Sequence, residues 1–161
     1  MFWSQYLRVL TFLFMKILMV CLGNICRSPL AQGIMEKYAP ENWTIDSAGT
    51  SGWHEDERPD TRSILIAKDR GIRIDHQRSR QVNETDFEIF DVIFAMDSSN
   101  YSNLIQLAPD EQSKSKIHLI LNEVSPIENR QVPDPYTGGQ QGFVHVYNLL
   151  EEAIQSFIKK H

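Results

Sequence analysis

The sequence predicts a three-layer α/β domain in which a parallel sheet is flanked by helices. Four short apolar runs alternate with segments whose apolar residues recur at helical spacing, and this alternation is typical of parallel sheets with crossover helices. The length of 161 residues is usual for a single domain. The hydrophobic and charged fractions, 42% and 23%, are those of ordinary globular domains and exclude disordered, collagen-like and low-complexity chains.

Each expected strand is a short apolar run, as in strands that are buried on both faces of a parallel sheet. The strands are expected over residues 16–20, 43–47, 91–96 and 117–121. The helices are expected over residues 28–39, 60–69, 98–108 and 143–158. Ser28 and Pro29 are expected as the N-cap and first residue of the first helix. Pro40, Gly71 and Pro109 end the first three helices.

Residues 1–14 are expected to be an N-terminal extension without a catalytic role, and residues 15–161 the catalytic domain. The apolar run in the extension is too short for a membrane span, and no signal-peptide cleavage site follows it. The sequence therefore predicts a cytoplasmic protein without stable membrane insertion. It leaves open whether the extension is a mis-assigned start, a helix packed on the core or a surface arm.

Charge and cysteine content exclude two further classes of protein. A net charge of −5 without a long basic run argues against binding of nucleic acid. Two cysteines cannot form a disulfide framework, although they leave room for one pair or for a reactive thiol. Cys21, Cys26 and a histidine could be combined into a zinc site on paper. Metal-ligand spacings such as C-x2-C are absent, so we expect no metal.

Residues 21–27, CLGNICR, connect the first expected strand to the first expected helix and are called the Cys21 loop. A helix N-terminus and successive loop N–H groups together form a site for an anion. Gly23 and Asn24 tolerate the backbone angles that such a site needs. Arg27 adds a planar fork that matches two phosphate oxygens. The residues expected to bind phosphate are Leu22, Gly23, Asn24, Ile25, Cys26 and Arg27.

Cys21 lies at the mouth of this anion site, where the thiolate form of a cysteine is favoured. A thiolate that faces a bound phosphorus atom is a nucleophile in position, and Ser28 can donate its hydroxyl to the sulfur. Taken separately, Cys21 could be a small buried hydrophobe and Arg27 a solvated charge. Neither alternative explains their spacing between a strand and a Ser-Pro helix start, so we prefer the catalytic interpretation.

A phosphatase that uses a thiolate also needs an acid, because a tyrosyl leaving oxygen has a pKa of about 10. Asp134 precedes Pro135 in a loop rich in proline and glycine, expected over residues 132–141. Pro135 forces Asp134 into an extended backbone and projects its carboxylate from a stiff turn. An ordinary turn aspartate would suit the same composition. The prediction of a general acid therefore depends on the combination with the Cys21 loop.

The segment VCLGNICRSP, residues 20–29, resembles the signature of the low-molecular-weight protein tyrosine phosphatases. The resemblance covers residues 15–161 and includes DSAGT at 46–50, Trp53, PD at 59–60, GI at 71–72, MD at 96–97 and DPY at 134–136. It implies a four-stranded parallel sheet, a cysteinyl-phosphate intermediate, and neither a metal nor another cofactor. It also implies that Cys21 is the nucleophile, Arg27 the phosphate clamp and Asp134 the general acid, later the base for water.

The resemblance extends to residues that support the catalytic groups. It implies that Asn24, Ser28 and Ser47 hold the Cys21 loop in shape through hydrogen bonds. It also implies that His76 and Asp97 form a supporting pair.

The resemblance makes Trp53 and Tyr136 the aromatic walls of the substrate cleft. Many members of the family have a second aromatic residue after this tyrosine, whereas this chain has Thr137, which opens the rim of the cleft. Residues 54–57, HEDE, are expected to be a solvated loop face.

Two other functions compete with phosphotyrosine hydrolysis. Thioredoxin-coupled arsenate reductases resemble the same fold and loop, but they need further cysteines, and this chain has none after Cys26. A non-catalytic phosphotyrosine-binding module is expected to lack Cys21, Arg27 or Asp134, all of which are present. The partners implied are a phosphotyrosine-containing protein, a tyrosine kinase, and inorganic phosphate or another oxyanion as product or inhibitor.

Cys26 follows Cys21 within a loop that curls around an anion, so the two sulfur atoms can face each other. A disulfide requires Cα atoms within about 7 Å, which a tight loop allows. Such a disulfide would trap the sulfenic acid that peroxide forms on an accessible thiolate. Cys26 could instead fill space behind the loop. The family resemblance favours the redox role for Cys21 and Cys26.

Overall fold

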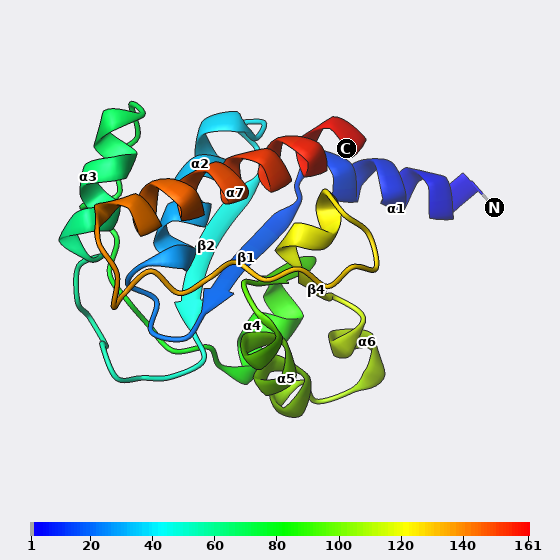
Figure 1. Ribbon diagram of the computed structural model, residues 1–161. Coiled ribbons are helices and arrows are strands. Elements are labelled where there is room, and N and C mark those ends of the chain that lie inside the picture. The colour runs from blue at the N-terminus through cyan, green and yellow to red at the C-terminus, as the bar shows by residue number, and fades with distance from the viewer. Residues whose placement is uncertain (1) are drawn as a thin grey trace.

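The computed structural model describes residues 2–161 and contains a four-stranded sheet of order β2-β1-β3-β4 with parallel neighbours (Figure 1). The strands are β1 (Lys16–Cys21), β2 (Thr44–Gly49), β3 (Val92–Ala95) and β4 (Ile117–Leu119). The chain passes from β1 to β2 on one side and then returns to β3 on the other. A crevice therefore opens at the carboxyl end of β1, where ligands bind in sheets of this kind. The predicted fold class is confirmed.

The described residues form seven α-helices and one 3₁₀ helix. They are α1 (Phe2–Leu13), α2 (Arg27–Tyr38), α3 (Thr61–Asp69), α4 (Glu84–Ile89), α5 (Ser98–Leu107), α6 (Glu111–Lys114), α7 (Gln140–Lys160) and the 3₁₀ helix η1 (Ile120–Glu123). Helices α2, α3 and α7 contribute to the core on one face, and α4 and α5 contribute to the core on the other (Figure 1).

The side chains of β1 alternate between these two cores. Ile17 and Met19 belong to the core that α2, α3 and α7 cover, whereas Leu18 and Val20 belong to the opposite core. All four side chains are fully buried. A strand that is buried on both faces is a continuous apolar run, which is why this strand could be predicted.

Helix α7 packs on the sheet near its C-terminal end, where the rings of Phe94 in β3 and Phe157 meet edge to face with centroids 5.2 Å apart. The loop that carries Asp134 begins with a contact to the residue after β3. Val132 is buried, and its N–H donates to Met96 O at 2.8 Å, directly after β3. Residues 132–139, here called the Asp134 loop, therefore start beside the carboxyl end of the sheet.

The predicted start of the first domain helix is wrong in one respect. Helix α2 begins at Arg27 with Cys26 as its N-cap, and no side chain caps it. Ser28 is the second residue of the helix, and its hydroxyl faces Cys21 and Asn24, so it does not cap the helix. Pro29 is then the third helical residue, where its missing N–H still lacks an intrahelical partner.

Three short elements had not been predicted. Helix α4 has six residues and helix α6 has four, too few to show a hydrophobic period. A capping box stabilises α4, since Asn83 Oδ1 accepts from Asp86 N and Asp86 Oδ2 accepts from Asn83 N. The last expected strand is shorter than predicted, because the chain turns into η1 after Leu119.

The N-terminal extension forms α1, which projects beyond the body of the molecule near the C-terminus (Figure 1). Trp3 is 81% exposed and Tyr6 is 67% exposed, so α1 is a surface arm and these side chains are not packed on the core. Among residues 2–161, no helix is both long enough and apolar enough to cross a membrane.

Candidate active site

The Cys21 loop turns its carbonyl groups outward, toward neighbouring elements. Four of them accept hydrogen bonds: Cys21 O from Thr50 N (2.9 Å), Leu22 O from Ser51 N (2.9 Å), Ile25 O from Asp60 N (2.8 Å) and Cys26 O from Ser63 Oγ (3.1 Å). In a trans peptide the N–H lies opposite the C=O, so the following N–H groups point toward the inside of the loop. Asn24 has a φ of 56°, in the left-handed region that asparagine tolerates. The loop has the form of an anion-binding nest.

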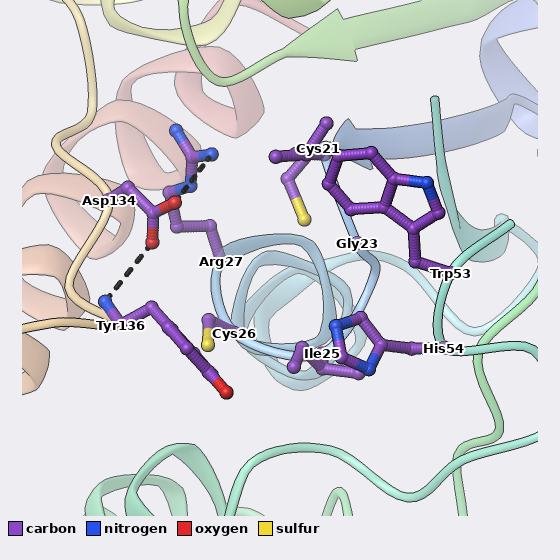
Figure 2. A pocket seen from close by; sticks show the side chains of 10 residues that line it. Cys21, Gly23, Ile25, Cys26, Arg27, Trp53, His54, Asp134 and Tyr136 are labelled. Atoms are coloured by element: carbon purple, nitrogen blue, oxygen red, sulfur yellow. Dashed lines mark hydrogen bonds and ion pairs between the residues drawn. The ribbon is translucent and has the colours of Figure 1, made fainter. Parts of the chain in front are cut away.

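A pocket of about 190 Å³ opens over this nest. Every residue of the Cys21 loop except Asn24 lines it, together with Trp53, His54, Asp134 and Tyr136 (Figure 2). Cys21 is 2% exposed, and its sulfur lies 3.0 Å from Ser28 Oγ. The structure thus brings the predicted nucleophile, phosphate-binding loop and acid to one cavity.

The hydrogen bonds around Asn24 determine the direction of the bond between Ser28 and Cys21. Arg80 N is a donor, so the atom that it contacts at 3.0 Å is Asn24 Oδ1. The Nδ2 group of Asn24 then donates to Ser28 Oγ at 2.8 Å and to Ser47 Oγ at 3.0 Å. Ser28 keeps its own hydrogen, and Cys21 Sγ at 3.0 Å is a nearer acceptor than Ala48 O at 3.5 Å. Ser28 is therefore placed to donate to the sulfur.

Two residues that the sequence analysis did not single out hold this network in place. Gln32 Oε1 accepts from Ser47 Oγ at 2.7 Å, which orients the Ser47 lone pair toward Asn24. The guanidinium of Arg80 contacts the carboxylates of Asp46 and Asp86 at 3.0 Å each. Burial lowers the pKa of Arg80, but these two carboxylates outweigh burial and raise it above its ordinary value. Arg80 is thus a fixed cation whose backbone orients Asn24.

Arg27 is 2% exposed, and two hydrogen bonds hold its side chain in place. Its Nη1 donates to Asp97 Oδ2 at 2.7 Å and to Val132 O at 3.0 Å. Burial alone would lower the pKa of Arg27, but the charges of Cys21, Asp97 and Asp134 together raise it above its ordinary value. Arg27 is therefore a permanent cation beside the sulfur, with Asp97 as its anchor.

Asp134 reaches the pocket from the Asp134 loop, facing Arg27 (Figure 2). Its Oδ2 lies 3.9 Å from Arg27 Nη2, and its Oδ1 accepts from Tyr136 N at 3.1 Å. The side chain is 50% exposed, so the carboxylate can exchange protons with solvent while it faces the anion site. This placement suits a proton donor that acts on a group bound above the nest.

Trp53 and Tyr136 stand on opposite sides of the pocket (Figure 2). Trp53 is 76% exposed and Tyr136 is 51% exposed, so both rings present apolar surface to an entering group. His54 was missed by the sequence analysis, which treated residues 54–57 as a solvated face. Its ring lines the pocket and pairs through Nδ1 with Glu57 Oε2 at 2.8 Å. No local pattern could have shown that this loop folds over Gly23.

The expected pairing of His76 with Asp97 is wrong. His76 is exposed, and no hydrogen bond or ion pair in the described chain joins it to Asp97, which binds Arg27 instead. The next residue, Gln77, is the buried one, and its Nε2 donates to Pro29 O at 3.2 Å. A one-residue difference in loop orientation reverses which side chain points inward, and a motif alone does not specify that orientation.

Cys26 is 5% exposed and lines the same pocket as Cys21. Burial, followed by the negative charges of Asp60, Cys21 and Asp134, raises the pKa of the Cys26 thiol to about 12. The two cysteines are free in this structure. Over the described part of the chain, no group of three or more His, Cys, Asp or Glu side chains is arranged to hold a metal ion.

Comparison with known proteins agrees with this geometry. Residues 16–161 match the family model described as low molecular weight phosphotyrosine protein phosphatase. A protein of that name from Schizosaccharomyces pombe is 43% identical over 150 residues, which cover 89% of this chain and 95% of the relative.

Two solved structures share the whole fold. The protein tyrosine phosphatase of Entamoeba histolytica, with Hepes in its active site, is 44% identical with a TM-score of 0.84 and covers 91% of this chain and 96% of its own. Vibrio vulnificus Wzb, in complex with benzylphosphonate, is 31% identical with a TM-score of 0.84 and covers 92% and 99%. The family resemblance of the sequence is confirmed: this chain belongs to the low molecular weight phosphotyrosine protein phosphatases, which are hydrolases of phosphate esters.

Proposed function

We propose that this protein hydrolyses phosphotyrosine in proteins through a phosphocysteine at Cys21. The observation that supports this most directly is the position of the Cys21 sulfur, 3.0 Å from Ser28 Oγ, within a loop that also presents Arg27. Asp134 faces the same cavity from a separate loop. A nucleophile, an anion clamp and an acid are the groups that this chemistry needs.

Substrate binding depends on groups that are in place before the substrate arrives. The inward N–H groups of the Cys21 loop donate hydrogen bonds to the three non-bridging phosphate oxygens, and the Arg27 fork donates to two of them. Asp97 Oδ2 and Val132 O accept hydrogen bonds from Arg27 Nη1. Because these bonds fix the guanidinium, the site needs little reorganisation when charge develops on the phosphoryl group.

In the first chemical step, the Cys21 thiolate attacks phosphorus in line with the tyrosyl oxygen. The S–P bond forms while the P–O bond to the tyrosine breaks, and Asp134 gives its proton to the departing oxygen. Tyrosine leaves as a neutral phenol and Asp134 becomes a carboxylate. The hydrogen bond from Ser28 stabilises the sulfur as a thiolate before attack.

In the second step, the Asp134 carboxylate takes a proton from a water molecule, which attacks the phosphocysteine. The S–P bond breaks, inorganic phosphate forms, and the sulfur leaves as a thiolate that Ser28 again stabilises. Asp134 is left protonated and ready for the next substrate. The same carboxyl group thus acts as acid and then as base.

Preference for aryl phosphates follows from the walls of the pocket. The phosphate of phosphotyrosine lies farther from its backbone than that of phosphoserine, so it can reach the nest while its ring packs between Trp53 and Tyr136. The substrate is then a tyrosine-phosphorylated protein, which a tyrosine kinase must supply. Arsenate reduction is not favoured, because the chain has only two cysteines and both lie in the Cys21 loop.

Hydrolysis of a phosphotyrosine peptide, a phosphoserine peptide and arsenate under the same conditions tests this proposal. We expect phosphate release from the phosphotyrosine peptide alone, and a rapidly quenched reaction should carry phosphate on a fragment that contains Cys21. Turnover of arsenate with a thiol reductant, or labelling of another residue, would contradict it.

A further inference from the structure

The first turn of α3 contacts the Cys21 loop and the Asp134 loop at the same time. These loops are far apart in the sequence and carry the proposed nucleophile and acid. The relative position of the two loops sets the distance between the acid and the leaving oxygen. A small displacement of a catalytic group is costly, since an error of about 1 Å can reduce the rate about a hundredfold.

Two contacts join this turn to the Cys21 loop. Asp60 N donates to Ile25 O at 2.8 Å, and Ser63 Oγ donates to Cys26 O at 3.1 Å. Ser63 is completely buried. The turn is therefore anchored to the nest by one hydrogen bond between backbone atoms and by a second from a buried side chain to a backbone carbonyl.

Arg62 joins the same turn to the Asp134 loop. Its Nη1 donates to Gly138 O and its Nη2 to Tyr136 O, both at 2.9 Å. The guanidinium also lies 4.4 Å from the centroid of the Phe143 ring in α7. Tyr136 in turn donates its N–H to Asp134 Oδ1 at 3.1 Å. Tyr136 is thus the one residue that links Arg62 to the carboxyl group of Asp134.

Asp60 fixes the orientation of the Arg62 guanidinium. Its Oδ1 accepts from Arg62 Nε and its Oδ2 accepts from Arg62 Nη2, both at 3.0 Å. The hydrogen bond from Arg62 is also the main reason why the pKa of Asp60 lies below its ordinary value. This two-point contact requires a planar fork, which arginine has and lysine does not.

We propose that Asp60 and Arg62 are positioning residues that hold Asp134 at the height of the leaving oxygen above the Cys21 loop. This inference rests on the proposed function, because it assigns a role relative to the proposed acid. Arg62 acts through the Asp134 loop, by way of its backbone carbonyls and of the Tyr136 ring 5.7 Å away, and does not itself line the pocket.

The test compares Arg62→Ala with wild type on phosphotyrosine and on an aryl phosphate with an activated leaving group. We expect kcat on phosphotyrosine to fall about tenfold to a hundredfold, and kcat on the activated substrate to fall less than about threefold. Arg62→Lys should show the same fall in kcat on phosphotyrosine, because lysine lacks the planar fork. Inhibition by inorganic phosphate should stay unchanged, which also shows that the nest is folded.

A second arm places Arg62→Ala in the Asp134→Ala background. If Arg62 acts through Asp134, its removal there should cost less than about threefold on phosphotyrosine. Equal losses on the two substrates, or a full loss in the Asp134→Ala background, would overturn the proposal. If Arg62→Ala folds poorly, Asp60→Asn replaces it in the test. This variant keeps the Asp60 N–H and weakens the two-point contact with Arg62, and it should lower kcat on phosphotyrosine more than kcat on the activated substrate.

Arg73→Ala is the matched control, because Arg73 also pairs with an aspartate two residues away, Asp75, but at an exposed site. It should leave both activities unchanged. Failure of the underlying mechanism would be seen separately: Asp134→Ala alone would then lose the same factor on both substrates.

Discussion

The Cys21 loop is mostly buried, whereas the Asp134 loop lies largely at the surface. Asn24 and Arg27 are 3% and 2% exposed. By contrast, the side chain of Asp134 is 50% exposed and Tyr136 is 51% exposed. Side chains and backbone groups from β2, α3 and the loop before α4 hold the first loop. The second is held by Arg62, by the contact of Val132 with Met96 and by the turn from Pro135 O to Gly138 N.

The difference in exposure between the two loops corresponds to the role that we propose for each of them. A phosphate dianion is strongly hydrated, so a site that replaces its water must present fixed donors before binding. A general acid must instead lose and regain a proton in every cycle, which is easier for a carboxyl group in contact with solvent. In the proposed mechanism, the buried Cys21 loop therefore holds the phosphate, and the exposed Asp134 loop supplies the proton.

The largest expected effect comes from Cys21→Ser in the buried half. A serine hydroxyl does not ionise near neutral pH, so turnover should fall by more than about a thousandfold. Binding of inorganic phosphate, measured by calorimetry, should persist because the donors of the loop remain. Cys26→Ser, the control, should keep its turnover. Substantial activity of Cys21→Ser would count against a phosphocysteine.

Asp134→Ala should remove the proposed general acid of the exposed Asp134 loop and leave the Cys21 loop intact. We expect kcat on phosphotyrosine to fall by about 10²–10⁴-fold, with a much smaller loss on an activated aryl phosphate. The physical reason is that a basic leaving oxygen needs protonation more than an acidic one. A leaving-group series measured by stopped flow checks this, and parallel losses across the series would remove Asp134 from the acid role.

A smaller effect on activity is expected when peroxide oxidises Cys21 and Cys26 and dithiothreitol then reduces them. The Cys26 pKa of about 12 means that its thiolate fraction rises about tenfold per pH unit below that value. Trapping of a Cys21 sulfenic acid by Cys26 should therefore be more complete at about pH 8.5 than at about pH 6.5. Activity recovered with dithiothreitol after peroxide treatment measures the trapped fraction.

The control for this experiment is Cys26→Ser, which should recover little activity at either pH. If wild type and Cys26→Ser recover equally, no protective disulfide forms. Cys26 would then only fill space beside the nest.

The smallest effect is expected from removal of residues 1–14, which we propose to be a non-catalytic extension. Since Trp3 and Tyr6 of α1 are mostly exposed, little buried apolar area would be lost. A chain that starts at Met15 should keep its kcat/KM and its unfolding temperature. A joint fall in both would show that α1 stabilises the domain.

The sequence determined those features that depend on residues close together in the chain. The strands could be predicted because a strand buried on both faces is a continuous apolar run, as β1 is. The Cys21 loop could be predicted because its sulfur, its N–H groups and Arg27 lie within seven consecutive residues. Asp134 followed from a local Pro-restricted turn, once the chemistry of the loop required an acid.

The tertiary structure alone decided the contacts between distant segments. Asp97 lies 70 residues from Arg27 in the sequence, and Arg62 lies 74 residues from Tyr136. His54 was taken for a solvated residue, and His76 was expected to pair with Asp97, although it is exposed. A side chain's direction depends on how whole helices and loops pack, and packing is a sum of many weak interactions that no short motif contains. The proposed nucleophile could therefore be predicted from the sequence, whereas the contact of Asp97 with Arg27 and the contacts of Arg62 with the Asp134 loop could not.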